Sequence, residues 1–517
     1  MDAPRPNILI FLVDEMQFDV TQPSSPCQMP ALQKFAEEGV TFTRAFTPSP
    51  HCCPSRATLM TGVYPSRHGI CNNVETDTAH QFGLNPGVRT FAQDLIRAGY
   101  RLSYAGKWHL SNEETPADRG WNEVTSFAKK IPRGHRQWAG RTAKPVVLDG
   151  PRAHGHMVRP GWGDQVINSG FVDDILQTHY YQNAVGPGIE ELRRLTQEDD
   201  PWCLCISTDM GPKSVGVRAL FEQYDPSTFD LPPNFHDKME DKPNIYRRIR
   251  EQVWGQLSLA EVREGMASYF ANCSLEDCYF KRILQALEET GKADDTLVLF
   301  ISDHGDYNFA HGLQYMGIPP FREAYHVPVV ARWPGGLVAP GRTVDHLVSL
   351  SDIAPTLIEL AGTTPEDAKS GRSLVPFLKN ETPSNWRDDL FFQTNGNEVY
   401  YTQRIAMTDR YKYVYNAFDY DELYDLEKDS GELVNLIHPS RYPQPEPFAE
   451  TPEQDVHPLP RIAPQLEPVR REMMSRIWAF AIQENDTIFS GFAPIAVATY
   501  GPMVGLEWMQ GDRNAQT

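Results

Sequence analysis

The 517-residue sequence has few cysteines, no excess of positive charge and no long apolar run. Its eight cysteines are too sparse for a disulfide framework, which fits a reducing compartment. The formal net charge of -20 argues against general binding to nucleic acid or to anionic membranes, because long-range repulsion slows both encounters. No stretch is apolar over the length that a membrane span needs, and no basic segment precedes the N-terminal apolar run as in a signal peptide. We therefore expect a cytoplasmic protein without nucleic-acid or membrane partners, and its oligomeric state stays open.

Apolar runs alternate with helical patterns over most of the chain. The run "NILIFLVDE" (7–15) and the run "TLVLFIS" (296–302) are typical of buried interior strands. A long helix precedes the second run, and Ser258 and Glu261 form a capping-box pattern at its start. The alternation predicts an α/β domain over residues 1–385, with a large, mostly parallel sheet flanked by helices.

The pattern changes after about residue 385. The stretches "RIAMTDRYKYVYNA" and "DELYDLEKDSGELVNL" are typical of short antiparallel strands joined by turns. Residues 436–468 are rich in proline, which indicates an extended surface segment, and a helix is expected over 466–484. We therefore predict a smaller C-terminal α+β subdomain over residues 386–517, containing a small antiparallel sheet.

Acidic residues follow two of the predicted strands. Asp14 and Glu15 end the first run, and Asp303 and His304 follow the run 296–302. The carboxyl ends of parallel strands meet at one edge of a sheet, where these carboxylates would repel one another without a cation between them. Carboxylate oxygens favour Ca²⁺, Mg²⁺ or Mn²⁺, and a histidine ligand shifts the preference toward Mn²⁺. The alternative is that Asp14 and Asp303 only cap loops or helices.

The stretch "SPHCCPSRATLMTGVYP" (49–65) places two cysteines at the start of a predicted helix. Pro54 suits the first turn of a helix, where its missing N–H costs nothing. The preceding residues then face a helix N-terminus, which favours anions, and Arg56 adds a cation one turn further on. A nucleophile at Cys52 would therefore attack a negatively charged substrate in a favourable field. Alternatively, Cys52 and Cys53 are two small buried apolar residues.

Several motifs together resemble one enzyme family. The motif "CCPSR" (52–56) resembles the C-x-P-S-R signature of the type I sulfatases of the alkaline phosphatase superfamily, in which the first cysteine is oxidised to formylglycine. The stretch "GYRLSYAGKWHL" (99–110) resembles the family's second signature. The stretches "SDHGD", "YHVPVVARWPGG", "VSLSDIAPTLIELAG" and "ELYDLEKDSGELVNL" resemble further landmarks in the family's order. The resemblance covers most of residues 7–436 and implies an alkaline phosphatase-like fold and the hydrolysis of a sulfate monoester.

The resemblance implies a role for each matching residue. A formylglycine-generating maturation enzyme would convert Cys52 into the nucleophile, and Cys53 would occupy a variable position. Arg56 would hold the hydrated aldehyde, Lys107 would bridge it to the sulfate, and His109 would hydrogen-bond one of its hydroxyls. One hydroxyl would attack sulfur and expel the alcohol, and the other would then lose its proton as sulfate leaves and the aldehyde re-forms.

The resemblance also implies one divalent metal ion, with Ca²⁺ as the first choice and Mn²⁺ as the alternative. Glu15 stands where many sulfatases have a second aspartate. The implied ligands are Asp14, Glu15, Asp303, His304 and the modified Cys52.

Two family residues are missing. In "STDMGPKSV" (207–215), Pro212 stands where the family has the histidine that protonates the leaving oxygen, and Lys213 lies beside it. In "HGLQYMG" (311–317), Met316 stands where the family has a sulfate-binding lysine. A divergent sulfatase would use Lys213, His311 or a residue of another loop to bind the substrate in these roles.

Two other functions compete with the sulfatase hypothesis. The phosphonate monoester and phosphodiester hydrolases share the nucleophile motif, and Asn73 falls where they place a substrate-binding asparagine. Lys107 and His109 are more typical of sulfatases. A catalytically silent, ligand-binding relative is the third hypothesis, against which the intact motifs argue.

The basic stretch "KKIPRGHRQWAGRTAK" (129–144) contrasts with the acidic remainder of the chain. We hypothesise that it borders the mouth of the site and helps to bind a sulfated sugar, although a solvated loop is the commoner meaning of such a run. The expected partner is therefore an oligosaccharide or small-molecule sulfate ester. Carbohydrate is the broadest expectation, and aryl and choline esters stay open.

Overall fold

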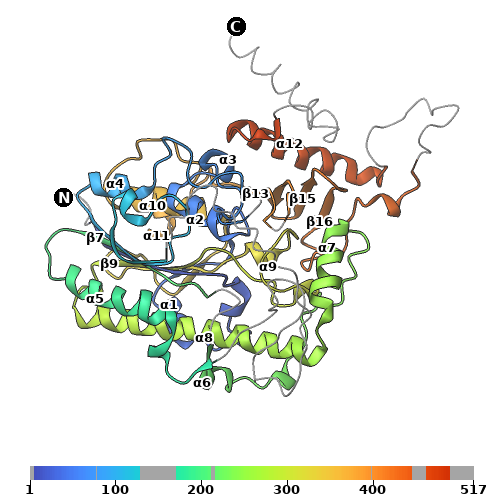
Figure 1. Ribbon diagram of the computed structural model, residues 1–517. Helices are drawn as coiled ribbons and strands as arrows, with labels where there is room; N and C mark the ends of the chain where they lie inside the picture. Colours follow the sequence, from blue (N-terminus) through green and yellow to red (C-terminus); the bar gives the residue numbers. More distant parts are fainter. Residues whose placement is uncertain are drawn as a thin grey trace, which may run out of the picture.

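A computed structural model describes residues 5–76, 79–127, 171–210, 216–397, 399–444 and 461–489. Its centre is an eight-stranded sheet with the order β11-β2-β10-β9-β1-β7-β4-β5 (Figure 1). Only β10 runs antiparallel to its neighbours in this sheet, so the predicted mostly parallel sheet is confirmed. The strands, in chain order, are β1 (Asn7–Val13), β2 (Val40–Phe42), β4 (Arg101–Gly106), β5 (Asn122–Ser126), β7 (Trp202–Ser207), β9 (Thr296–Ser302), β10 (Val329–Arg332) and β11 (Arg342–Val344).

The central strand β1 shows why its sequence is a continuous apolar run. Residues 8–13 are all fully buried, because β1 pairs with β7 on one side and β9 on the other while helices cover both faces of the sheet. Leu9 and Phe11 pack into the cluster on one face, and Ile8 and Ile10 pack into the cluster on the other. A strand with both faces buried needs apolar side chains at every position.

Helices cover the two faces of the sheet (Figure 1). The long helix α8 (Leu259–Glu289) and helices α1 and α5 cover one face, where Phe11 stacks on Phe280 at a centroid distance of 5.5 Å. Helices α2, α4 and α10 cover the opposite face. The predicted capping box of α8 is confirmed, because the backbone N–H of Ser258 donates to the Glu261 carboxylate at 2.9 Å. The other helices of this part are α1 (Pro30–Glu37), α2 (Cys52–Thr61), α3 (Pro65–His68), α4 (Phe91–Arg97), α5 (Gly186–Leu195), α6 (Arg218–Phe221), α7 (Asn244–Arg248), α9 (Arg322–Tyr325), α10 (Ile353–Leu360) and α11 (Val375–Leu378).

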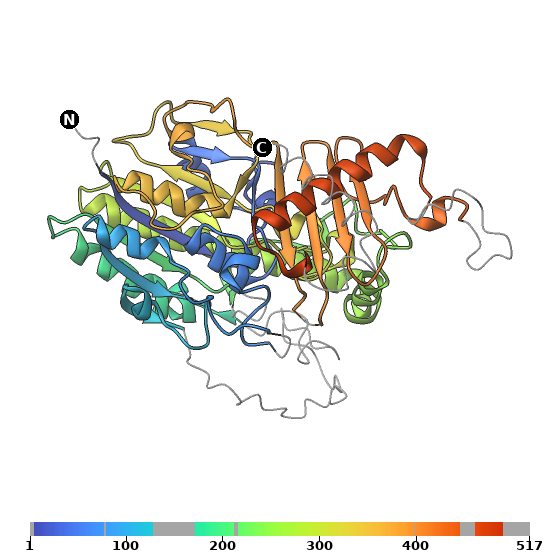
Figure 2. The ribbon, with the colours of Figure 1, turned by 90° about the horizontal axis from the view of Figure 1, so that it is seen from above.

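A separate four-stranded antiparallel sheet forms the C-terminal part, as predicted. Helix α12 (Glu467–Gln483) crosses one face of this sheet (Figure 2), where Trp478 and Met474 pack against Tyr413 and Tyr415. The strands are β13 (Asp389–Thr394), β14 (Gln403–Thr408), β15 (Tyr411–Asn416) and β16 (Glu422–Asp425). The two-stranded pairs β3 (Ala45–Phe46) with β12 (Val348–Ser349) and β6 (Phe171–Val172) with β8 (Gly216–Val217) complete the strands. The boundary between residues 385 and 386 stays a prediction.

Two further observations concern the cysteines and the helices. All eight cysteines are free thiols. Within the described residues, no helix combines the length and the apolarity that crossing a bilayer demands.

Candidate active site

Four charged side chains converge at the carboxyl edge of the large sheet. Asp303 follows β9, Asp14 follows β1, Asp209 lies after β7 and Lys107 follows β4, and these four strands are consecutive in the sheet. Ligands of α/β sheets gather outside this edge. The sheet order therefore brings together residues that are far apart in the sequence.

Helix α2 brings the nucleophile candidate to the same edge. Cys52 is its first residue, Pro54 lies in its first turn as predicted, and Arg56 lies one turn from its start. All ten residues of α2 are buried, so the helix is a fixed part of the core. The positive end of the helix dipole therefore faces the carboxyl edge from a rigid position.

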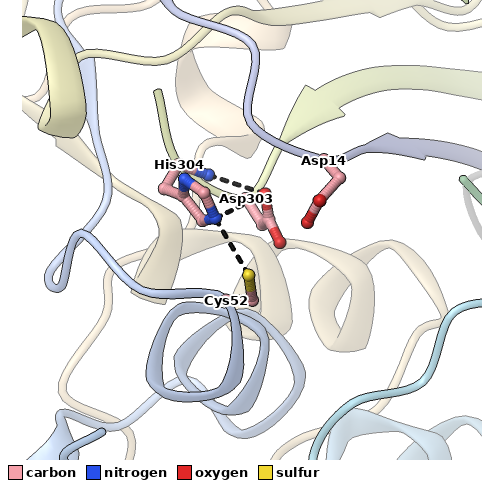
Figure 3. A group of neighbouring side chains, drawn as sticks. All are labelled: Asp14, Cys52, Asp303 and His304. Carbon is pink, nitrogen blue, oxygen red and sulfur yellow. Dashed lines mark hydrogen bonds and ion pairs between the residues drawn. The ribbon is translucent and has the colours of Figure 1, made fainter. Parts of the chain in front are cut away.

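Asp14, Cys52, Asp303 and His304 form a compact group whose ligand atoms all lie within 4.8 Å of one another (Figure 3). The Cys52 sulfur lies 3.1 Å from Nε2 of His304. Nδ1 of His304 lies 2.9 Å from the carbonyl oxygen of Gly305, to which it donates, so Nε2 keeps its lone pair toward the group. Two carboxylates, an imidazole nitrogen and residue 52 together form a suitable donor set for a divalent metal ion.

Glu15, the remaining predicted metal ligand, is not in this group of four. Its backbone N–H donates to Asp303 at 3.1 Å, but its carboxylate oxygen Oε1 is buried and has no hydrogen-bond partner among the described residues. Burial raises the pKa of Glu15 well above its usual range, and the nearby carboxylate of Asp306 raises it further.

The Arg56 guanidinium compensates the negative charges of Asp14 and Asp303. Its guanidinium donates to Asp303 at 2.6 Å and to Asp14 at 3.3 Å, and also to the Lys107 carbonyl at 2.9 Å and the Ser207 hydroxyl at 2.8 Å. Burial alone would raise the pKa of Asp303, but the Arg56 guanidinium together with His304 and Lys107 outweighs burial and holds the pKa well below its usual range. Arg56 is fully buried, so its charge reaches the group with little screening.

Lys107 is held between two carboxylates. Its ammonium lies 2.8 Å from Asp14 and 2.8 Å from Asp209, and only 9% of its side chain is exposed. The preceding residue, Gly106, has a φ of 106°, and a Cβ there would lie 1.9 Å from the Ser207 carbonyl oxygen. Only glycine allows β4 to pass β7 this closely before Lys107 turns into the site.

Residue 52 is a neutral thiol in this environment. Burial and, to a lesser extent, the nearby Asp14 carboxylate raise the pKa of Cys52 to about 12. Burial also lowers the pKa of the neighbouring His51 to about 3. An unmodified Cys52 would therefore be a weak nucleophile at neutral pH, because the thiolate is the reactive form.

His109 and Asn73 lie beside the first turn of α2. Nε2 of His109 is 2.8 Å from a carboxylate oxygen of Glu75, and the backbone N–H of Cys53 donates to Oδ1 of Asn73 at 2.9 Å. Burial alone would lower the pKa of His109, but the carboxylate of Glu75 raises it to about 10. His109 and Glu75 therefore form an ion pair beside Cys52.

The sequence analysis missed Asp209 and Glu75, each of which pairs with a predicted catalytic residue. About 40% of each side chain is exposed, so both border the open side of the site. A search for acidic residues after every apolar run would have found Asp209, because it follows β7 as Asp14 follows β1. No spacing pattern distinguishes Glu75.

The structure does not bring His311 into the groups around Cys52. Its ring is fully buried, stacks on Phe321 at 3.5 Å, and bonds through Nδ1 to Asp237 at 2.8 Å. Met316 lines an apolar cavity of about 180 Å³ together with Trp254 and other apolar residues. Lys213, Pro212 and the basic stretch 129–144 lie outside the described residues.

Comparison with known proteins agrees with this fold. The family model Sulfatase matches residues 6–363, and the model N-sulphoglucosamine sulphohydrolase, C-terminal, matches residues 319–446. The chain therefore belongs to the sulfatase family, the class of enzymes that hydrolyse sulfuric esters.

Three similar proteins illustrate the range of the family. The choline-sulfatase of Rhizobium meliloti is 28% identical over 474 residues, covering 86% of this chain and 84% of that protein. The N-acetylglucosamine-6-O-sulfatase of Bacteroides thetaiotaomicron is 23% identical over 522 residues, covering 85% of this chain and 84% of that protein. The crystal structure of the phosphonate monoester hydrolase of Agrobacterium radiobacter superposes with a TM-score of 0.70 at 23% identity, covering 93% of this chain and 96% of that chain.

Proposed function

We propose that the protein hydrolyses a sulfate monoester through a formylglycine made from Cys52 and one bound divalent metal ion. The observation that carries this proposal is the group of Asp14, Cys52, Asp303 and His304 within 4.8 Å at the N-terminus of a buried helix. The buried cation of Arg56 lies against the same carboxylates. A maturation enzyme would have to oxidise Cys52 before the site becomes active.

The residues present fit a divalent metal ion. Asp14, Asp303 and Nε2 of His304 would hold it together with an oxygen of the modified residue 52, and Glu15 is a further candidate. The carboxylates favour Ca²⁺, and the imidazole makes Mn²⁺ the alternative. When bound, the ion would supply Lewis-acid polarisation of a sulfate oxygen and favour the deprotonated form of residue 52.

The chain's own residues would perform the remaining steps. The helix N-terminus, Arg56 and Lys107 supply the positive field for a sulfate group, and Asp14 and Asp209 fix the Lys107 ammonium. One hydroxyl of the hydrated aldehyde attacks sulfur as the alcohol leaves with a proton. The second hydroxyl then loses its proton, the carbon–oxygen bond to sulfate breaks, and the aldehyde is restored.

The proposed substrate class is a sulfated carbohydrate. The support comes from the N-acetylglucosamine-6-O-sulfatase relative and from the match to the C-terminal model of N-sulphoglucosamine sulphohydrolase. The choline-sulfatase relative makes a small cationic ester the first comparison substrate.

A second candidate function is the hydrolysis of phosphonate monoesters or phosphodiesters. It is favoured by the place of Asn73 beside the first turn of α2 and by the structural similarity to a phosphonate monoester hydrolase. The Asn73 oxygen is already bonded to the Cys53 backbone N–H, which leaves its side-chain N–H₂ group for a substrate.

Two measurements test the proposal. Peptide mass spectrometry of protein from maturase-competent cells should show an aldehyde in place of the thiol at Cys52, and an unmodified thiol in active enzyme would refute the mechanism. Hydrolysis of 4-nitrophenyl sulfate, a glucosamine 6-sulfate, choline sulfate, phenyl phenylphosphonate and a phosphodiester should then be compared. The sulfate esters should react fastest, Cys52→Ala should abolish turnover, and the matched control Cys278→Ala, on half-buried Cys278 of α8, should keep it.

A further inference from the structure

The carboxylate of Glu75 connects the side chains of His109 and Cys53 beside the nucleophile. Its Oε2 atom lies 2.8 Å from Nε2 of His109 and 3.7 Å from the sulfur of Cys53. The corresponding ligand atoms of Cys53, Glu75 and His109 all lie within 4.8 Å of one another. This second group therefore adjoins the Cys52 group through the peptide bond between residues 52 and 53.

The hydrogen bonds leave one nitrogen of His109 for residue 52. Nε2 is committed to Glu75, whereas Nδ1 is buried and has no hydrogen-bond partner among the described residues. The imidazole lies close enough to the Cys52 thiol to offset part of the rise in its pKa, so the ring lies beside residue 52, although the contact is too loose for a hydrogen bond. His109 has a φ of 56°, so the backbone itself is turned to present this ring.

The loop that carries Glu75 is attached to the first turn of α2. The Cys53 N–H donates to Asn73 at 2.9 Å, and the Val74 N–H donates to the Cys53 sulfur at 3.5 Å. The side chain of Asn112 holds the Val74 carbonyl oxygen at 2.7 Å. These contacts determine where the Glu75 carboxylate lies, so Cys53 has a structural purpose beyond filling space.

We propose that Glu75 is a positioning residue for the sulfatase reaction: it holds His109 so that Nδ1 faces the reacting side chain at position 52. The Cys53 thiol in turn holds the Glu75 carboxylate. This inference rests on the proposed formylglycine chemistry. Carboxylates that accept the second N–H of a functional histidine fix its ring orientation. Pairing also compensates the negative charge of Glu75, which would otherwise repel an approaching sulfate ester.

The first test is the kinetics of Glu75→Ala with 4-nitrophenyl sulfate. We expect kcat to fall by about 10–100-fold, the range found when a residue supporting a functional histidine is removed, with a much smaller change in KM. Glu75→Gln should keep most of the activity, because its amide oxygen still accepts from Nε2. Glu190→Ala on the exposed face of α5 is the matched control and should behave as the unaltered enzyme.

A double-mutant cycle shows whether Glu75 acts through His109. The double variant Glu75→Ala/His109→Ala should be no slower than His109→Ala alone. If the kcat losses of the two single variants multiply in the double variant, the proposal is overturned. A Glu75→Ala variant with unchanged kcat would overturn it as well. Cys53→Ala, a smaller change for use if Glu75→Ala does not fold, should reduce kcat several-fold. Where both variants fold, it should have no further effect in the Glu75→Ala background.

Mass spectrometry of the Cys52 peptide in each variant separates this inference from the proposed function. If unaltered enzyme turns over with an unmodified Cys52, the formylglycine chemistry is wrong. If the aldehyde is present in every variant but the Glu75 and His109 losses multiply, only the positioning role is wrong.

Discussion

Replacing Arg56 by methionine is the sharpest test of the electrostatics of the site. The substitution keeps the approximate volume of the side chain but removes a fully buried cation that donates to Asp14 and Asp303. It also removes the donors to the Lys107 carbonyl and the Ser207 hydroxyl. Two buried carboxylates would then face each other without their main compensating charge.

The expected cost in unfolding free energy is about 3–5 kcal/mol, the range for breaking a buried ion pair by removing one partner. The matched control is Arg44→Met, because Arg44 bonds at 2.8 Å to Asp409, whose side chain is 75% exposed. An exposed pair of this kind contributes only about 0–1 kcal/mol. The difference between the two variants therefore isolates burial from the mere presence of an ion pair.

Urea denaturation in a chelating buffer measures both costs without a contribution from bound metal. The double variant Arg56→Met/Asp303→Asn should be more stable than Arg56→Met, because the second change removes one of the uncompensated charges. If Arg56→Met costs less than about 1 kcal/mol, or if the Asp303 change adds to its cost, the carboxylates are not held by Arg56 and the reasoning is wrong.

Three further predictions follow from other parts of the structure. Burial lowers the pKa of His68 from 6.5 to about 3, so below pH 6.5 the unfolded chain binds a proton at His68 that the folded protein does not bind. The free energy of unfolding should therefore fall by about 1.4 kcal/mol for each pH unit toward acid. Denaturation at several pH values should show a shallower dependence on pH for His68→Asn. Gly106→Ala should lower stability and kcat more than the control Gly291→Ala. Both glycines have positive φ, which costs about 1–2 kcal/mol in either variant, but only the Cβ at residue 106 would meet a carbonyl oxygen. Equal melting temperatures of the two variants would refute this reasoning. Chelation should abolish activity, and added Ca²⁺ or Mn²⁺ should restore it. Metal at 100 times its Kd should increase the free energy of unfolding by about 2.7 kcal/mol, measured by thermal unfolding. The Asp303→Asn variant should not show this increase.

Much of the fold could be predicted because its signals are local. The runs 7–15 and 296–302 are continuous apolar stretches and form β1 and β9, and the capping box marks the start of α8. Strand order depends instead on pairing between distant segments, such as Ile8 with Cys203. The antiparallel direction of β10 likewise depends on its pairing with β9 and β2, for which the sequence has no local signal.

The candidate site was predictable to the extent that its residues belong to motifs. Asp14, Asp303 and His304 follow apolar runs, so the rule about strand ends brought these three together, whereas Cys52 joined them through the resemblance of its motif to the sulfatase signature. Glu75 lies in an irregular loop, and its function depends on contacts with His109 and Cys53 that only the folded chain creates. The sequence shows that Met316 replaces the sulfate-binding lysine of the family motif. The apolar cavity that Met316 lines could not be predicted from that single position.

The charge balance of the site bears on which anion it accepts. Among the residues that the structure describes, each cation near residue 52 is paired: Arg56 with Asp14 and Asp303, Lys107 with Asp14 and Asp209, and His109 with Glu75. Met316 also adds no charge where the family has a lysine. With the side-chain charges balanced in this way, the proposed divalent metal ion would supply the surplus positive charge that attracts an anionic ester. Sulfate monoesters, phosphonate monoesters and phosphodiesters are all singly charged, so charge does not distinguish among them. Discrimination among these esters must then come from the groups that contact the leaving alcohol and the non-reacting oxygens. The comparison of substrates, rather than the identity of the metal or the nucleophile, therefore decides between the two candidate functions.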